Sequence, residues 1–507
     1  MSWLYRLSLM FKKHDRQSKL LAPIRAARYF LRNVRTKVSE GSSEEGAAGK
    51  QSLTVPAFWY SRNQALLLMA GLFLLTRVFG GVTAPFQSPD EFNHLKRAYL
   101  LSTAVLITDN RGPLSGGLVD KGLLQYMDCF TEIPNNYSAK VSRSEIRSCN
   151  EIHFADKRIF SDLDNTAMYF PFLYTPQAVA LLIGEKFRLT VANSYYLARL
   201  FSSCAALALL LAALMIYPAP PSVLALFTLP MCVFQLSSAS LDGMTFATTV
   251  LAASIFLRGC DKRLEFNSRL HFVLAACVFS LSTARDIYIV LTPLLALLYK
   301  ARRSPSYIIS FLTVLCLSLV WIIFALKAVH GQGAIVQQTS TPDILRYYGM
   351  HPGTFLAVVV RTLTEDGVIR SYWRMFVGSL GSLDTPVASA AYIVFAFELL
   401  AIALVSTSAA SLRSLNTANL VLACAAVAST LLLFLVALSA WTAHPATFIE
   451  RMSGRYFYPG AFLFLFASTP PALSRTGVAL SYALLILMGI SSVEFAVPAL
   501  VDRYYTH

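Results

Sequence analysis

Long apolar runs alternate with shorter polar stretches from about residue 64 towards the C-terminus. A helix needs about 20 predominantly apolar residues to cross the hydrocarbon core of a bilayer, so this pattern predicts membrane-spanning helices. The predicted spans are residues 64–84, 195–217, 222–240, 243–258, 271–283, 287–300, 306–328, 388–407, 416–440, 456–471 and 478–499. Because several runs are short, we expect about eleven spans, within a range of about nine to thirteen.

Residues 168–186 are an apolar stretch that we do not assign as a span. Two prolines and a short apolar core favour a surface or re-entrant helix on the outer face. A full span here would also turn the later basic loops outward. The predicted organisation is a cytoplasmic segment over 1–62, a transmembrane domain over 63–500 with outer regions 85–194 and 329–387, and an outer tail over 501–507.

Composition supports this all-α, polytopic fold class with a large first outer loop that contains juxtamembrane helices. The 507 residues are 55% hydrophobic and 14% charged, which excludes a soluble globular protein. The net charge of +15 does not indicate nucleic-acid binding, because about twelve Lys and Arg precede residue 63 against four acids. Residues 39–51 are a low-complexity linker with the composition of a disordered segment.

The loops between the predicted spans carry a charge asymmetry that fixes the expected orientation. With the N-terminus in the cytoplasm, the basic loops 258–263 and 300–303 lie inside. The large loop 109–165 then lies outside, with about seven basic and nine acidic residues. Two of the eight cysteines, Cys129 and Cys149, fall in this outer loop, where a disulfide is plausible in an oxidising compartment. Their spacing matches no zinc site.

The segment 88–99, directly after the first span, carries the most informative polar residues. Ser88 and Glu91 have the spacing of a capping box, and Pro89 suits the first position of a helix. At about 100° per residue, Asp90, His94 and Arg97 fall on one face of this helix. Phe92, Leu95 and Tyr99 fall on the opposite face. We therefore predict an amphipathic helix on the membrane surface that shows Asp90 to a polar cavity.

Other ionisable residues are predicted at the same face of the membrane. Asp242 lies at the outer end of a span, Arg285 at the tip of a short hairpin, Asp384 in the second outer region, and Arg455 at the start of an apolar run. Ionisable groups that border the hydrocarbon are expensive and usually mark a site. Their convergence is therefore a candidate site.

Spaced motifs across roughly residues 64–471 resemble a known family of bacterial membrane proteins. The motifs are Ser88-Pro-Asp-Glu with His94 and Arg97-Ala, Tyr169-Phe-Pro with Tyr174-Thr-Pro-Gln177, Pro230 through Gln235 with Ser238 and Asp242, Gly378-Ser-Leu-Gly-Ser-Leu-Asp-Thr385, and Gly454-Arg-Tyr-Phe-Tyr-Pro459. The family is domain of unknown function 2142, placed in the GT-C glycosyltransferase superfamily. The chain departs from the family where Ala284-Arg-Asp replaces the more usual lysine before proline.

The resemblance implies a multi-span protein of the bacterial cytoplasmic membrane whose active site opens to the periplasm. It also implies a catalytic acid in the first outer loop and a sugar donor carried on polyprenyl phosphate. The partners would then be the bilayer, the lipid-linked sugar and a glycan or lipid-linked acceptor, with no nucleic acid.

We interpret Asp90 as the general base that deprotonates the acceptor hydroxyl, with inversion at the anomeric carbon. Alternatively, it complements the helix dipole. Glu91 and His94 are further catalytic candidates, although Glu91 is explained better as a capping partner. Arg285 and Arg455 are interpreted as a clamp on the donor phosphate, or alternatively as arginines bound to lipid headgroups.

The remaining candidates are expected to bind substrate: Arg97, Tyr174, Gln177, Asp242 and Asp384. For Tyr174 the alternative is an interfacial aromatic. No D-x-D doublet is present, so we expect no required metal, although a divalent cation held by Asp242 and Asp384 remains possible. Two other function classes stay open: a transporter of lipid-linked saccharide or another envelope precursor, and a non-catalytic scaffold of an envelope polysaccharide assembly complex.

Overall fold

We describe the protein from a computed structural model, which describes residues 61–111, 115–163, 166–329, 341–406, 416–450, 452–467 and 475–506. Residues 1–60 lie outside this set. The predicted cytoplasmic segment and its disordered linker therefore stay predictions. The described part belongs to one compact unit that spans Val55–His507.

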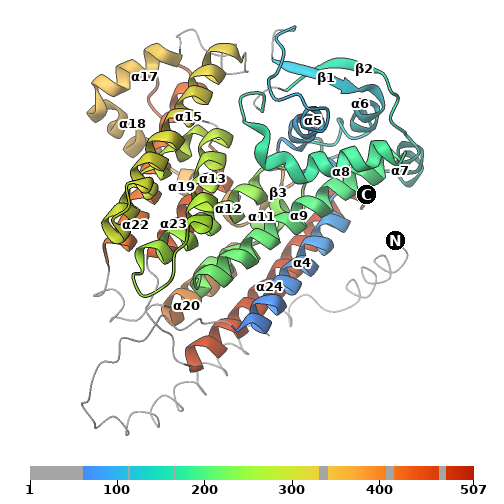
Figure 1. Cartoon of the computed structure of the whole chain (residues 1–507). Helices are drawn as coiled ribbons and strands as arrows, with labels where there is room; N and C mark the ends of the chain where they lie inside the picture. The colour runs from blue at the N-terminus through green and yellow to red at the C-terminus, as the bar shows by residue number, and fades with distance from the viewer. Residues whose placement is uncertain are drawn as a thin grey trace. The chain divides into compact units, whose positions relative to one another are not determined.

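Seven of the described helices are long and apolar enough to cross a membrane. They are α4 (Arg62–Val82), α9 (Val191–Ile216), α12 (Asp242–Cys260), α15 (Ser306–Ala328), α20 (Ser389–Ser406), α22 (Thr417–Ala440) and α24 (Arg475–Tyr504). Each coincides with a run that the apolar pattern predicts as a span. Figure 1 shows α4, α9 and α24 side by side, and α4 contacts both of the others.

The other four predicted spans are shorter or interrupted, so a count of eleven is not confirmed. Two of them break at prolines, which remove a backbone donor and clash with the preceding turn. Run 222–240 becomes α10 (Pro221–Thr228) and α11 (Pro230–Leu236), and run 287–300 becomes a 3-10 turn η2 (Asp286–Leu291) and α14 (Pro293–Arg302). The other two are α13 (Ser268–Ala284) and the 3-10 turn η3 (Gly454–Phe457) followed by α23 (Tyr458–Ala467).

Helix α12 is the centre of the helical packing. Of its most apolar 18-residue window, 89% is buried inside the protein, against 17–44% for the other six long helices. It contacts α9, α13, α14, α22 and α23. Its sequence is rich in Ala, Thr, Ser and Gly, and small residues let neighbouring helices approach closely in membranes. Its first residue, Asp242, is thereby fixed at one end of the packed core.

The region predicted as the first outer loop, residues 85–194, folds into short elements around the start of the candidate site. These are α5 (Glu91–Ser102), β1 (Gly116–Asp120), α6 (Lys121–Asp128), α7 (Arg143–Asn150), β2 (Arg158–Asp162), η1 (Pro171–Tyr174) and α8 (Thr175–Lys186). Strands β1 and β2 pair antiparallel, with Leu118 opposite Phe160. A disulfide joins Cys129 at the end of α6 to Cys149 in α7, so the pairing left open by the sequence is formed. Helix α8 has 12 residues and is not long enough to span.

The second outer region contains three amphipathic helices and a small hairpin. Its elements are α17 (Thr341–Met350), α18 (Pro352–Thr364), α19 (Val368–Gly378), β3 (Ser379–Leu380) and β4 (Thr385–Pro386). Helix α24 continues to Tyr504, four residues beyond the predicted domain boundary at residue 500.

Polar contacts define two ends of the helical bundle. At one end, Arg302 of α14 donates hydrogen bonds to the carbonyl oxygens of Gly259 and Asp261 at 2.9 and 2.8 Å, which ties α14 to the end of α12. Arg258 also donates to the carbonyl of Ile216, the last residue of α9, at 3.0 Å. We call this end the Arg302 end. Asp242 and the loop after α4 lie at the opposite end, the Asp90 end.

Candidate functional site

Asp90 occupies the residue before α5 in a left-handed backbone conformation, with φ 61° and ψ 8°. The predicted helix start is therefore wrong in detail: α5 begins at Glu91, Pro89 precedes it, and the capping residue Asp90 makes no side-chain capping bond. One half of the predicted capping box is present, because the Ser88 amide donates to the Glu91 carboxylate at 3.3 Å. Aspartate tolerates the left-handed region better than most residues.

Arg455 links the Asp90 loop to the turn before α23. Its Nη2 donates to Asp90 Oδ2 at 2.5 Å, and its Nη1 donates to the carbonyl oxygen of Pro89 at 3.3 Å. The Arg455 side chain is 3% exposed, whereas that of Asp90 is 30% exposed. The carboxylate of this ion pair is therefore the partner that remains accessible from outside.

A second ion pair stands directly beside the first. Arg285, at the end of α13, donates to the Oδ1 atom of Asp242. The other carboxylate oxygen of Asp242 lies 3.7 Å from Arg455 Nε. Both guanidinium groups also lie near the ring of Tyr456, with centroid distances of 4.8 Å for Arg285 and 5.0 Å for Arg455. Four distant segments thus contribute two carboxylates and two guanidinium groups to one cluster, the Asp90 cluster (Asp90, Asp242, Arg285 and Arg455).

His94 lies one turn into α5 and is buried against Tyr174, with 2.6 Å between His94 Nδ1 and the Tyr174 hydroxyl oxygen. Burial lowers the pKa of His94 from 6.5 to about 4, and the nearby Asp90 and Asp242 carboxylates only partly oppose this shift. The imidazole is therefore neutral at pH 7 and does not supply a positive charge to Asp90.

Arg97 is turned to the backbone of the loop that carries the Tyr169 motif. Its guanidinium donates to the carbonyl oxygens of Tyr169 at 3.0 Å and Leu106 at 2.7 Å. Residues on both predicted faces of α5 are buried, including Arg97, Leu95 and Tyr99. The predicted surface helix is therefore wrong: α5 packs beneath α8, η1 and β1.

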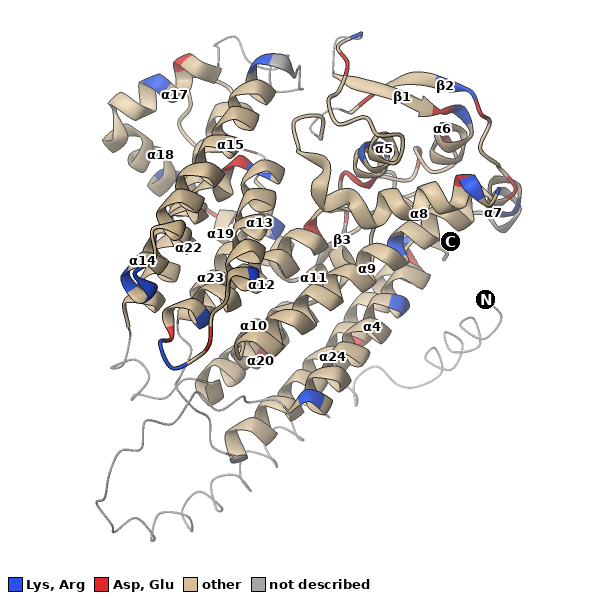
Figure 2. Ribbon diagram, viewed as in Figure 1, with Lys and Arg blue, Asp and Glu red and all other residues tan. Residues whose placement is uncertain are grey.

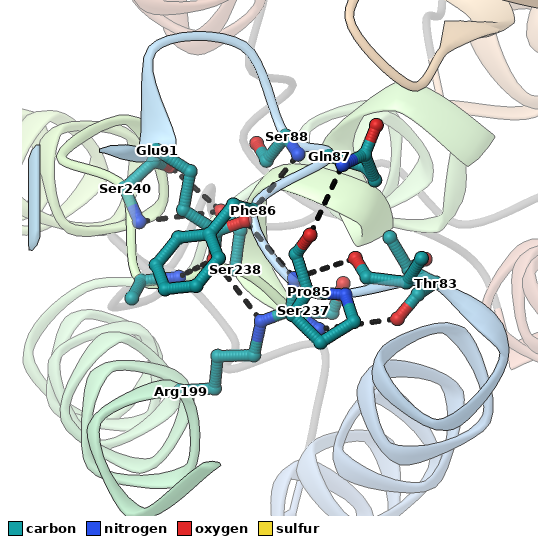
Figure 3. A network of polar contacts seen from close by, with 12 residues as sticks. Thr83, Pro85, Phe86, Gln87, Ser88, Glu91, Arg199, Ser237, Ser238 and Ser240 are labelled. Carbon is teal, nitrogen blue, oxygen red and sulfur yellow. Dashed lines mark hydrogen bonds and ion pairs between the residues drawn. The ribbon is translucent and has the colours of Figure 1, made fainter. Parts of the chain in front are cut away.

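Glu91 lies in a polar network with Arg199 (Figure 3). Asp90 instead forms its ion pair with Arg455. Arg199 of α9 donates to both Glu91 oxygens, at 3.0 and 2.9 Å, and Tyr195 and the Ala239 amide donate to Oε1 at 3.1 and 2.8 Å. The Glu91 and Arg199 side chains are 0% and 3% exposed. This network ties the Asp90 loop to α9 and to the turn before α12.

The other predicted binding residues also have structural partners. Gln177 of α8 donates to Ser202 Oγ at 3.0 Å and to the carbonyl of Ser240 at 3.1 Å. Asp384 accepts two hydrogen bonds from Arg503 of α24 on one oxygen, Oδ2, at 2.8 and 3.2 Å, and the same oxygen accepts from the Asn135 amide at 3.1 Å. The structure thus places Asp384 in a different ion pair from those of the Asp90 cluster.

Reasoning from the sequence missed several partners in these networks, among them Arg199, Tyr456 and Arg503. Arg199 had a usable signal, because it is a lone charge within the apolar run of α9. Tyr456 and Arg503 had no usable signal in the sequence. An aromatic residue next to an arginine is common, and so is a basic residue just after an apolar run.

The cluster does not have the donor set of a metal site. Across the described ranges, no group of three or more His, Cys, Asp or Glu side chains is placed to hold a metal ion. Asp90 and Asp242 each face an arginine, which neutralises the charge that a divalent cation would require.

The fold and the cluster define a polytopic helical membrane protein with an ionic site at one end of its bundle. The family model described as "Predicted membrane protein (DUF2142)" matches residues 73–464, so the chain belongs to this family. Comparisons with curated proteins and with solved structures gave no match. The family description gives location in a membrane and no reaction, so function must be argued from the site.

The Glu91 network predicts a large stability effect. Replacing Glu91 with Ala leaves the Arg199 charge buried without its carboxylate, so we expect a loss of about 3–5 kcal/mol in the free energy of unfolding. The double variant Glu91→Leu/Arg199→Met should recover most of the lost free energy of unfolding, because it removes both buried charges. Thermal unfolding of the purified protein in detergent measures both. A Glu91→Ala protein as stable as the parent would contradict the structural role.

His94 predicts a stability change with pH. Its pKa is lowered in the folded state, so between pH 6.5 and about 4 the unfolded state binds more protons and stability falls as the pH falls. Replacing His94 with Asn should make the melting temperature depend less on pH between pH 6.5 and about 4. His153→Asn, at an exposed position, is the control and should keep the parent profile. Identical profiles for all three proteins would show that His94 is not buried in its neutral form.

Proposed function

We propose that the protein is a membrane glycosyltransferase of GT-C type that transfers a sugar from a polyprenyl-phosphate donor to an envelope glycan or lipid-linked acceptor. One observation carries the proposal: the accessible Asp90 carboxylate lies in one cluster with two guanidinium groups. Such a transfer needs a base for the acceptor hydroxyl and cations for the departing phosphate. The cluster supplies both kinds of group side by side.

In the proposed reaction, Asp90 accepts the proton of the acceptor hydroxyl while the hydroxyl oxygen attacks the anomeric carbon. The bond between that carbon and the donor phosphate oxygen breaks, and the phosphate leaves with the electron pair. A single displacement inverts the anomeric centre. The Arg455 guanidinium, held 3% exposed, and Arg285 stabilise the negative charge on the leaving phosphate.

The ion pair between Arg455 and Asp90 links donor binding to the activation of the base. Arg455 neutralises the charge of the Asp90 carboxylate, with 2.5 Å between Nη2 and Oδ2. A donor phosphate that approaches the arginines competes for the same guanidinium. Its binding would release Asp90 to accept a proton, and the Pro89 carbonyl would continue to hold Arg455 in place.

The other site residues then act as supports. The buried Glu91 network fixes the loop in which Asp90 adopts its left-handed conformation. Neutral His94 with Tyr174, and Arg97 with the Tyr169 carbonyl, position the walls beside the cluster. We place Asp242 as the residue that aligns the two arginines, since it faces both.

Charge and cysteine chemistry support an outward-facing site in the cytoplasmic membrane. The Arg302 end carries six Lys and Arg against two acids over residues 258–267 and 300–305, as expected of a cytoplasmic face. Figure 2 shows basic residues in the loop after α12 and at the end of α14. The disulfide lies in the outer region that begins at the Asp90 loop, and disulfides persist in oxidising compartments.

A transporter of lipid-linked saccharide is the second candidate, and two observations favour it. The α10–α11 segment is interrupted at Pro230, as are the helices that form many transport sites. Glu398 is a buried carboxyl in the middle of α20, where it accepts a hydrogen bond from Ser491 at 2.7 Å. Glu398 bonds to Ser491 of α24, which is not part of the Asp90 cluster, so variants of Glu398 and of Asp90 separate the two functions.

The enzyme proposal predicts that Asp90→Asn abolishes transfer without unfolding the protein. Asparagine tolerates the left-handed conformation but cannot accept the proton, so we expect at least about a hundredfold loss of transferred sugar. Arg455→Ala should reduce the transferred sugar by about the same factor. Arg455→Lys should restore only part of the transfer, because lysine cannot form two parallel hydrogen bonds to phosphate. The measurement is the composition of surface glycans and lipid-linked sugars in strains that carry each variant.

Glu450→Gln is the matched control for this experiment. It changes an exposed acid five residues before Arg455 and should leave the glycans unchanged. Unchanged glycans in the Asp90→Asn strain would refute the enzyme proposal. Accumulation of an unmodified lipid-linked saccharide on the cytoplasmic side, caused by Glu398→Ala and not by Asp90→Asn, would favour transport.

A further inference from the structure

A second recess lies at the Arg302 end, on the opposite side of the bundle from the Asp90 cluster. It has a volume of about 490 Å³ and is bordered by the ends of α9, α12 and α14 and by the start of α22. The polar part of its lining includes Tyr217, Lys262, Arg263, Lys300 and Thr417.

Positive charge prevails at the rim of this recess. Arg263 pairs with Asp261, with 2.7 Å between Nη2 and Oδ2, so the one acid in the lining is neutralised within the rim. Neither Lys262 nor Lys300 forms an ion pair with a described residue, and both are exposed. Two ammonium groups therefore face the recess with their charge uncompensated by the described residues.

The backbone that carries Lys262 is held by Arg302. Besides its bonds to Gly259 and Asp261, Arg302 donates to the carbonyl of Leu264 at 2.8 Å. The rim is thus a structured turn rather than a free loop end. This fixes the backbone of Lys262 beside the end of α14, where Lys300 lies two residues before Arg302.

The deeper walls of the recess are apolar. Phe256, Leu257, Leu297 and Val421 line it, and they belong to the spanning helices α12 and α22 and to α14. A basic rim above apolar walls at the end of membrane helices matches an anionic lipid, whose phosphate meets the cations while its glycerol and acyl parts meet the walls. Inorganic phosphate would use only the rim.

We propose that this recess, bordered by Lys262 and Lys300, binds the headgroup of an anionic phospholipid. The site is distinct from the donor phosphate site of the proposed reaction, because it lies at the other end of the bundle. Tyr217 and Thr417 supply hydroxyl donors for the phosphate oxygens next to the two lysines.

Titration of the purified full chain in detergent tests this assignment. Native mass spectrometry should show that short-chain phosphatidylglycerol binds the protein. Phosphatidylcholine should bind the same site with an affinity at least about tenfold lower. Each lysine should strengthen phosphatidylglycerol binding about fivefold, so Lys262→Ala/Lys300→Ala should weaken that binding roughly twenty-five-fold. Lys157→Ala/Lys186→Ala, two exposed lysines of the first outer region, should change it less than twofold.

Lysine acylation of the parent protein tests without variants whether Lys262 and Lys300 contact the bound lipid. Bound phosphatidylglycerol should protect Lys262 and Lys300 and leave Lys157 reactive, whereas an equal concentration of inorganic phosphate should protect neither. Equal binding of both lipids, equal weakening by both double variants, or protection by inorganic phosphate alone would overturn the proposal.

Discussion

Buried charge must be paired, and in this protein the pairing of arginines with carboxylates determines how the Asp90 end is built. An isolated ion removed from water costs several kcal/mol, so a buried guanidinium needs an acid from another segment or, like that of Arg97, backbone carbonyl oxygens. Arg199 with Glu91, Arg455 with Asp90, and Arg285 with Asp242 meet this need. These pairs join the loop after α4 to α9, α12, α13 and the turn before α23.

The adjacent acids Asp90 and Glu91 show how one short segment separates support from chemistry. The left-handed backbone at Asp90 sends the two side chains to different surroundings. Glu91 enters a fully buried network with Arg199, Tyr195 and the Ala239 amide. Asp90 remains 30% exposed beside Arg455. Asp90 is therefore the acid of this segment that solvent reaches, and Glu91 fixes the loop that carries it.

The apolar pattern predicted the elements that depend on local composition. Seven runs are long helices at the expected places, and the Cys129–Cys149 pairing is formed. The sequence also brought Asp90, Asp242, Arg285 and Arg455 to one predicted face, and the structure places them in contact. The failures depend on tertiary contacts. The burial of both faces of α5 follows from β1, η1 and α8, and the partner of Asp384 is Arg503, 119 residues away. Neither is encoded in local spacing.

In the proposed reaction, Arg285 and Arg455 hold a lipid-linked phosphate next to the Asp90 carboxylate. The most direct measurement is a cryo-electron microscopy map of the purified protein saturated with polyprenyl phosphate. The account predicts phosphate density within hydrogen-bond distance of both guanidinium groups, with Asp90 released from Arg455. Phosphate density elsewhere, together with an unchanged ion pair between Asp90 and Arg455, would contradict it.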